Sequence, residues 1–448
     1  MRIRRMALVL AALVVTITQS ATAHDGASPD RGREIMFHRS LNPATWSQHA
    51  YDTAWKQWGL TERPADFERA FRARYGLHVA PFDNKGKPMG LIEAPALLGK
   101  GVTNNCLLCH ASRVAGQTII GLGNASLDLQ SLFEDLNRAD SIDLKLPFQF
   151  SYVRGTIDPI NPLAFLLQFR DTELKLQSPR PFHYSANVCS DPPAWWLLKR
   201  KKTRDWTGPM DAHSTRIDMV TLLTPLNSGE YIKKQESAFA DIESYLRTIE
   251  APKYPFSIDR QLASKGQHLY ADTCARCHGT YGPDGKYPNK IVALNTLGTD
   301  RTLAEANDPE VVQFLNKSWF ARERGQDGEP LQFKEPAGYQ APPLDGVWAT
   351  APYFHNASVP TVYHVLNSKA RPKIYTRSFG TEPEDYDAAR LGWKITILNA
   401  PADPALPGFE QRKIYDTNLP GRGNGGHLYG DKLSDEERYA VIEYLKTL

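Results

Sequence analysis

The sequence predicts a mainly α-helical protein made of two similar halves, with long irregular loops and little strand. Three observations support this fold class. A Cys-x-x-Cys-His motif occurs twice, starting at Cys106 and at Cys274. A similar helical segment closes each half of the chain. Proline-rich stretches over residues 179–209 and 283–343 indicate that the rest of each half is largely loop.

Length and composition describe a globular protein with more than one domain. The chain has 448 residues, of which 41% are hydrophobic and 23% are charged. The formal net charge of +3 comes from three arginines within residues 1–23, and the remainder carries 50 basic and 50 acidic side chains. A chain that binds nucleic acid would need a basic face, so nucleic acid is excluded as the main partner.

Residues 1–23 have the features of an export signal. Arginines at positions 2, 4 and 5 precede an apolar run from Ala7 to Ile17, and Ala21-Thr22-Ala23 is a small-residue cleavage site. The eleven apolar residues are too few to span a bilayer as a helix. We therefore expect cleavage after Ala23 and a mature chain, without a membrane span, that is periplasmic or secreted.

Four of the five cysteines belong to the two Cys-x-x-Cys-His motifs. Cys106 and Cys109 precede His110, and Cys274 and Cys277 precede His278. This spacing attaches c-type haem, because the two sulfurs match the porphyrin vinyl groups and the histidine reaches the iron. The sequence thus predicts two covalently attached haems, here called haem 1 (His110) and haem 2 (His278).

Three other uses of cysteine pairs fit this chain less well. A zinc ribbon needs its cysteine pairs about 15–20 residues apart, whereas these motifs lie far apart in the chain. A thioredoxin-like redox pair needs a βαβ context, which neither motif shows, and disulfides across Cys-x-x-Cys form short, strained loops. The fifth cysteine, Cys189, has no role beyond a free or buried thiol.

The chain repeats itself loosely. Residues 242–249 and residues 441–448 share the pattern Tyr-Leu-basic-Thr-apolar. Each half therefore carries a haem motif and closes with a similar helix, which is the arrangement of two fused cytochrome c domains. We place the first domain at residues 24–250 and the second at 251–448, because Pro252 and Pro255 end the preceding helix and stiffen the link.

Two helices of the second domain are expected from local signals. A helix over about residues 258–270 should lead into the second haem motif. Ser434 caps the last helix, and Glu437 completes a capping box three residues later. Apolar residues recur along that helix at helical spacing, which gives it one face for the core.

The second domain has no methionine to offer its own haem, because Met219 is the last methionine in the chain. Four histidines remain, at positions 268, 355, 364 and 427. His427 follows Gly423-Asn424-Gly425-Gly426, a loop that allows close backbone approach and lets the imidazole be aimed. We favour His278 and His427 as the axial ligands of haem 2, with an ordinary loop histidine as the alternative.

Haem 1 has no evident sixth ligand. The candidates lie on both sides of its motif: Met36, His38, His49, His78, Met89, His183, Met210, His213 and Met219. None has a ligand-like context, so we expect an open or weakly occupied position. An iron with an open position can bind peroxide or dioxygen, whereas one with two strong ligands only transfers electrons.

The second half resembles a known superfamily. Residues 350–358 read Thr-Ala-Pro-Tyr-Phe-His-Asn-Ala-Ser, which is similar to the signature that follows the second haem in the di-haem cytochrome c peroxidase superfamily. That superfamily includes the enzyme that matures the methylamine dehydrogenase cofactor. Gly426-His427-Leu428-Tyr429-Gly430, before Leu433-Ser434-Asp435-Glu436, resembles the branch of rubber oxygenases and fatty-acid dioxygenases. The likeness covers most of residues 90–448, most clearly from residue 260.

The resemblance implies roles for several residues. In the oxygenase branch the histidine matching His427 is the distal ligand of the second haem. The superfamily relays electrons through a tryptophan between its haems, for which we choose Trp196, with an ordinary core tryptophan as the alternative. His355 is expected beside a haem as a further metal-site residue, with a buried hydrogen-bonding histidine as the alternative, and Asn124 is expected in the haem 1 pocket. Some relatives hold Ca²⁺ between their domains, which leaves a calcium ion open here.

Two departures limit the resemblance. The peroxidase branch has a distal histidine shortly after its first motif, but the next histidine after His110 is His183. The chain is also shorter than typical rubber oxygenases, so polymer cleavage is not expected from it. The basic run Lys199–Lys202 has two possible roles. It guides an acidic redox partner or the haem propionates, or it is simply a solvated loop.

Three functional hypotheses follow from the sequence. The first is an exported oxidoreductase that activates peroxide or dioxygen at haem 1, with His110 and Trp196 in the reaction and haem 2 as electron relay. The second is a non-catalytic di-haem electron carrier. A weaker third is a maturation enzyme that oxidises residues of a partner protein. A small redox protein or a quinol-derived donor is the expected electron partner.

Overall fold

The computed structural model describes residues 26–97, 99–325 and 328–448. The export signal predicted for residues 1–23 lies outside these ranges. Helices account for 36% of the structure and strands for 11%. The strands form small antiparallel sheets with the orders β1-β3-β2, β4-β5, β6-β7, β10-β9 and β11-β8-β12.

The α-helices of the first half carry the first haem motif on α5: α2 (Pro29–His38), α3 (Gln48–Thr53), α4 (Phe67–Tyr75), α5 (Leu107–His110), α6 (Leu129–Ala139), α7 (Asn161–Leu167), α8 (Gly229–Lys234) and α9 (Glu236–Leu246). Those of the second half carry the second motif on α11: α10 (Arg260–Thr273), α11 (Ala275–His278), α12 (Leu294–Leu297), α13 (Thr302–Glu305), α14 (Pro309–Lys317), α15 (Val362–Leu366), α16 (Gly408–Gln411) and α17 (Asp435–Leu445).

The strands are two to five residues long: β1 (Trp46–Ser47), β2 (Leu91–Pro95), β3 (Lys100–Asn104), β4 (Ala111–Val114), β5 (Gln117–Ile120), β6 (Ile291–Ala293), β7 (Gly338–Gln340), β8 (Ile374–Thr376), β9 (Tyr386–Asp387), β10 (Gly392–Trp393), β11 (Thr396–Ile397) and β12 (Tyr415–Asp416). The hairpin of β4 and β5 begins at Ala111, so a strand follows the first motif directly.

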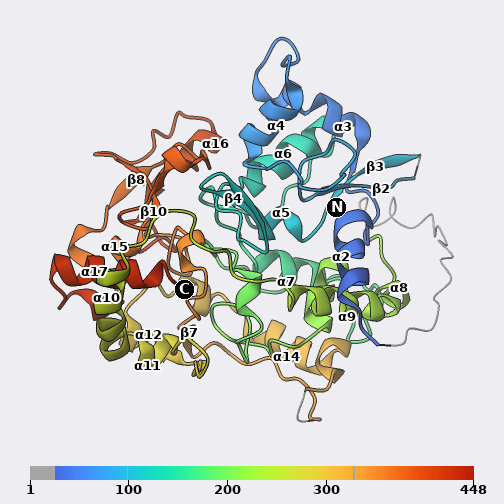
Figure 1. The fold of residues 1–448 in the computed structure, drawn as a ribbon. Helices are drawn as coiled ribbons and strands as arrows, with labels where there is room; N and C mark the ends of the chain where they lie inside the picture. Colours follow the sequence, from blue (N-terminus) through green and yellow to red (C-terminus); the bar gives the residue numbers. More distant parts are fainter. Residues whose placement is uncertain (1–25, 98, 326–327) are drawn as a thin grey trace.

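Two helix pairs repeat the same packing. Helix α2 packs against α9, and α10 packs against α17, on opposite sides of the molecule (Figure 1). A glycine marks each crossing, because a Cβ on Gly32 would lie 2.0 Å from the Asp241 carbonyl oxygen and one on Gly266 would lie 1.8 Å from that of Ala440. Asp241 and Ala440 directly precede the two copies of the sequence repeat, so the repeat has a structural counterpart.

The helix-capping signals in the sequence predicted the positions of α10 and α17, the second helix pair. Helix α10 starts at Arg260, where Asp259 caps it, and runs to Thr273, close to the expected segment. The capping box of Ser434 and Glu437 at the start of α17 is confirmed, with both of its hydrogen bonds present.

The apolar cores of the two halves are interlocked. Phe314 and Trp319 of the second half are buried in the same cluster as Leu107 and Ile242 of the first. In the other direction, Trp196 is buried in a cluster with residues of α17. The predicted division at residue 250 therefore separates the two helix pairs but cuts through both of these cores.

Candidate functional site

Both haem motifs form the same single helical turn. The backbone N–H of His110 donates to the Cys106 carbonyl at 3.1 Å, and that of His278 donates to the Cys274 carbonyl at 3.0 Å. Residues three apart share one face of a helix, so the two sulfurs of each motif lie on one side. All five cysteines are free thiols, so neither motif is closed by a disulfide.

The two motif histidines are held in the same way. Nδ1 of His110 lies 3.1 Å from the Pro193 carbonyl oxygen, and Nδ1 of His278 lies 2.8 Å from that of Pro342. Each carbonyl belongs to a Pro-Pro pair far along the chain. A carbonyl accepts only, so Nδ1 carries the proton and the lone pair of Nε2 is free to bind a metal.

Burial keeps these imidazoles neutral. It lowers the pKa of His110 to about 4, against the opposing effect of the Pro193 carbonyl, and it also lowers the pKa of His278. The pKa of His427 falls to about 3, mainly through burial and further through His278 and Arg371. Neutral imidazole is the form that binds metal ions.

His278 and His427 face the same cavity. Their ring centres are 6.2 Å apart, with the ring planes at 61°. Cys274 and Cys277 line this cavity with them, and it leaves about 1720 Å³ free of protein atoms, the part open to solvent included. The structure thus brings together the second motif and the histidine that the sequence paired with it.

Close backbone packing fixes the loop that carries His427, residues 421–427. The N–H of His427 donates to the Leu297 carbonyl at 2.8 Å. Gly426 has a φ of +71°, and a Cβ there would lie 2.3 Å from the carbonyl carbon of Gly298. Only glycine allows this approach, so Gly426 sets the loop against the end of α12.

Two side chains from the second half, buried Asn356 and partly buried Arg371, also hold this loop. Asn356 is fully buried, and its amide donates to the carbonyls of Gly421 and Gly423 at 3.2 and 3.0 Å. Arg371 donates to the carbonyls of Asn424 and Gly426 at 2.6 and 2.8 Å. Neither residue was singled out from the sequence, although Asn356 lies next to His355 in the signature segment.

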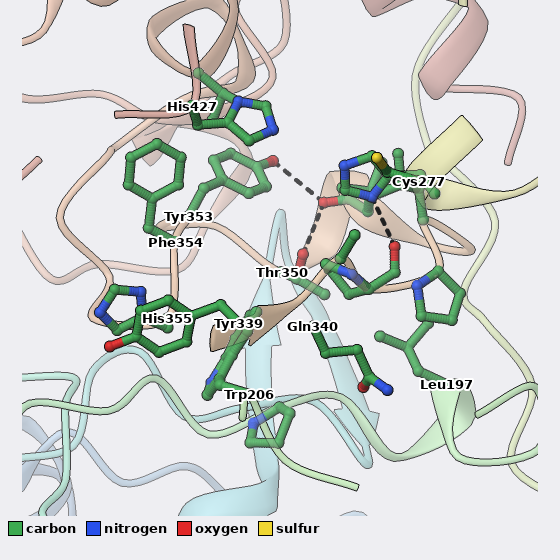
Figure 2. A pocket seen from close by; sticks show the side chains of 18 of the residues that line it. Leu197, Trp206, Cys277, Tyr339, Gln340, Thr350, Tyr353, Phe354, His355 and His427 are labelled. Carbon is green, nitrogen blue, oxygen red and sulfur yellow. Dashed lines mark hydrogen bonds between the residues drawn. The ribbon is translucent and has the colours of Figure 1, made fainter. Parts of the chain in front are cut away.

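The end of the cavity away from His427 is formed by aromatic and polar side chains (Figure 2). The His355 ring stacks on Tyr339 with 3.8 Å between ring centres, and its Nε2 is buried without a hydrogen-bond partner. Asp191 lines the same space, and burial raises the pKa of its carboxyl well above the usual range. His355 therefore shares the cavity with His278 and His427, and a metal-site role for it stays a prediction.

The adjacent tryptophans face different halves of the protein. Trp195 stacks on the His110 ring with 4.8 Å between ring centres and an interplanar angle of 19°. Trp196 is buried in the second core, where its Nε1 donates to the Asp345 carbonyl at 2.7 Å. Trp195, which the sequence gave no reason to prefer, is the one in contact with a motif histidine. The relay role of Trp196 stays a prediction.

Asn124 braces the first motif. Its amide donates to the carbonyls of Gly76 and Leu108 at 3.0 and 3.3 Å, and its backbone N–H donates to the Cys109 carbonyl at 2.8 Å. Its amide oxygen accepts from the Ser126 N–H at 3.1 Å. These bonds hold Asn124 against the backbone of the first motif, and its place in the haem 1 pocket stays a prediction.

The surroundings of the first motif include three of the candidate ligands. Met36, Met89 and Met219 are all buried in the apolar cluster against which Cys106 packs. His78 is buried instead beside Ser112, with its Nε2 3.3 Å from the serine hydroxyl. These placements assign no sixth ligand, and the open or weakly occupied position of haem 1 stays a prediction.

The basic run is only partly solvated. Arg200 forms an ion pair with Asp345 at 3.0 Å and donates to the Thr280 carbonyl. The Lys201 ammonium is buried and donates to the Asp205 carbonyl at 2.9 Å. Two of the four cations thus tie the halves together or line the cavity rather than forming an open surface patch.

Residues 26–97, 99–325 and 328–448 contain neither a metal-binding cluster nor a membrane-spanning helix. No group of three or more His, Cys, Asp and Glu side chains there is arranged to hold a metal ion by itself. No helix in the same ranges is long and apolar enough to cross a membrane. The calcium ion stays a prediction from the resemblance.

Comparison with known families supports a cytochrome c-like haem protein. Residues 338–376 match a family described as "RoxA-like, cytochrome c-like". This segment supplies much of the lining of the cavity, including His355 and Pro342, whose carbonyl accepts from His278 of the second motif. The match implies a c-type haem.

Two relatives come from Sinorhizobium fredii. The chain is 27% identical over 309 residues to "Uncharacterized protein y4iM", covering 58% of this chain and 64% of that protein. It is 26% identical over 302 residues to "Uncharacterized protein y4iJ", covering 54% and 47%. The chain thus spans less than two thirds of each relative.

A hydrazine synthase structure from Kuenenia stuttgartiensis covers 68% of this chain and 96% of its own, at 13% identity and a TM-score of 0.25. That score is too low to support any conclusion.

The residues around the cavity fit an iron porphyrin. An imidazole nitrogen binds a transition metal at about 2 Å and its ring centre lies about 1 Å further, so two imidazoles on one metal have centres roughly 6 Å apart. The centres of His278 and His427 are 6.2 Å apart. The free thiols of Cys274 and Cys277 lie at the same cavity, where they can form thioethers.

Proposed function

We propose that this chain is an exported haem-dependent oxidoreductase of the di-haem cytochrome c peroxidase superfamily, with peroxide or dioxygen as its oxidant. The observation that carries the proposal is the shared geometry of the two motifs. Each forms one helical turn, and the Nδ1–H of each histidine donates a hydrogen bond to a proline carbonyl. The family match to the cavity wall supports the haem assignment for the second motif.

The chain supplies the ligands and their orientation. Cys106, Cys109, Cys274 and Cys277 would form the thioether bonds, with His110 and His278 as proximal ligands. The Pro193 and Pro342 carbonyls orient these imidazoles and make them more basic. His427 completes the second site from the opposite side of the cavity. When bound, the haems supply one-electron chemistry, and a site with an open axial position supplies reduction of peroxide or dioxygen.

Contact through the interlocked cores supports communication between the two sites. Pro193 and Ala194 line the cavity of the second motif, while the Pro193 carbonyl accepts from His110 of the first. Trp195 follows directly and stacks on His110. A single short segment therefore touches both sites, which supports the second as an electron reservoir for the first.

The test is a count of haems and of their ligation states. Mass spectrometry of the haem-loaded protein should show two covalent haems, and Cys106→Ser with Cys109→Ser should leave one. Electron paramagnetic resonance should show one low-spin bis-histidine haem and one haem that responds to carbon monoxide. A single attached haem in the unaltered protein would contradict the proposal.

A di-haem electron carrier is the second candidate. It is favoured by the three buried methionines in the cluster against which Cys106 packs, because a methionine ligand would make the first site six-coordinate. The same spectra separate the two functions. Two low-spin haems that ignore carbon monoxide and peroxide would indicate the carrier.

A further inference from the structure

We propose that Arg371 is a positioning residue that holds His427 in the axial position of the second site, an inference that rests on the proposed function. The sequence offers no motif for this role, because Arg371 lies more than fifty residues before the loop it contacts. Three observations carry the argument: the hydrogen bonds of its guanidinium, the nature of their acceptors, and the composition of the loop.

The Arg371 guanidinium joins two segments through backbone carbonyls alone. Toward the loop it donates to Asn424 and Gly426, and more weakly to His427 itself at 3.4 Å. Toward α15 it donates to His364 at 2.9 Å and to Val365 at 3.2 Å. The planar fork of arginine suits such a multiple contact, which lysine does not reproduce.

The contact is reciprocal and extends to the aromatic wall of the cavity. The Asn424 amide donates back to the Pro372 carbonyl at 2.8 Å, so adjacent residues of each segment bond across. The Arg371 guanidinium also lies over the Phe354 ring at 5.0 Å, and that ring lies 5.8 Å from His427. Arg371 thus touches the histidine through its backbone and through a shared aromatic neighbour.

The loop needs such a clamp. It contains Gly421, Gly423, Gly425 and Gly426, so its unrestrained backbone has many accessible conformations. An axial ligand must stay within about 0.5 Å of its productive position. The backbone carbonyls of α15 are fixed by the helix, and Arg371 binds both these carbonyls and those of the loop. Arg371 therefore holds the loop at a fixed position relative to α15. Removing the clamp should therefore release His427 before it unfolds the domain.

The test compares four haem-loaded variants by electron paramagnetic resonance and by carbon monoxide titration of the reduced protein. Arg371→Gln should convert the low-spin signal of the second site largely to high spin and raise its carbon monoxide affinity by about 10–100-fold. Arg371→Lys, which keeps the charge but not the fork, should give an intermediate shift. Arg170→Gln is the matched control, because buried Arg170 also donates only to carbonyls, namely those of Leu174, Leu223, Thr224 and Asn227.

Each outcome has a distinct meaning. His427→Ala tests the proposed function: if its low-spin signal equals that of the unaltered protein, His427 is not a ligand and both ideas fail. If His427→Ala loses the signal but Arg371→Gln and Arg371→Lys keep it with unchanged carbon monoxide affinity, the role of Arg371 is refuted while the function stands. Equal high-spin conversion in Arg170→Gln would show a general loss of stability and would also overturn the positioning role.

Discussion

Replacing Gly426 with alanine should detach His427 from the second site. The glycine has a left-handed backbone, with φ at +71°, and its added Cβ would lie 2.3 Å from the Gly298 carbonyl carbon and 2.4 Å from the Thr299 nitrogen. Ordinary contacts at such a Cβ begin at 3.4 Å, so the loop must retreat by about 1 Å. The next residue is His427, and a metal bond of about 2 Å does not survive such a displacement.

The size of the effect follows from two contributions. A left-handed conformation costs an alanine about 1–2 kcal/mol, and overpacking against a fixed backbone costs about 1–3 kcal/mol. Together they disfavour the closed loop by at least about 2 kcal/mol, which lowers the ratio of bound to released His427 by roughly 30-fold or more. The helices α10 and α17 do not depend on this contact, so the fold should survive.

The assay is the absorption and electron paramagnetic resonance spectrum of the haem-loaded protein, with the melting temperature measured alongside. Gly425→Ala is the control, because a Cβ at Gly425 meets only the Gly298 carbonyl oxygen, at an ordinary 3.7 Å. We expect Gly426→Ala to gain high-spin haem and Gly425→Ala to match the unaltered protein. Identical low-spin spectra in both variants would refute the reasoning.

Three further predictions concern other parts of the chain. Gly32→Ala and Gly266→Ala should each destabilise the fold by about 2–4 kcal/mol in denaturant unfolding. The reason is that their Cβ atoms would lie 2.0 and 1.8 Å from carbonyl oxygens of the partner helices. Unchanged unfolding midpoints would contradict these helix crossings. Trp195→Leu should alter the spectrum of haem 1 through the lost stacking on His110, whereas Trp196→Leu should mainly lower stability; the reverse pattern would favour Trp196 as the residue that communicates with haem 1. Burial raises the pKa of Asp158 to about 6, so the native state keeps a proton that the unfolded chain releases near pH 4. The contribution of this carboxyl to the free energy of unfolding is therefore fully present below about pH 4 and is lost as the pH rises through 6. Asp158→Asn should flatten this part of the stability profile, and an equally steep profile in the variant would show that Asp158 does not cause it.

The sequence predicted those parts of the structure that depend on local signals. Helix α10 and the capping box of Ser434 follow from cap chemistry and apolar spacing within one helix. The closeness of His278 and His427 could be expected because the second half has no methionine and His427 follows a glycine-rich loop, while their pairing on one haem stays a prediction. In both cases the information lies in residues close together in the chain or in the absence of a residue type from one half of it.

The remaining features depend on contacts between distant segments. Pro193 and Pro342 accept from motif histidines more than sixty residues away, and a carbonyl carries no side-chain signal of that role. The repeated Pro-Pro pair was the available hint. Arg371 and Asn356 act on backbone carbonyls, which any loop provides. The interlocked cores likewise depend on which apolar faces meet, and apolar periodicity does not specify the partner.

The central claim is a bis-histidine second site beside a reactive first site. It is tested most directly by electron paramagnetic resonance of the haem-loaded protein and of His427→Ala, each with and without carbon monoxide after reduction. We predict one low-spin and one carbon monoxide-binding haem in the unaltered protein, and two carbon monoxide-binding haems in the variant. A variant whose low-spin signal is unchanged, or an unaltered protein with two haems inert to carbon monoxide, would contradict the account.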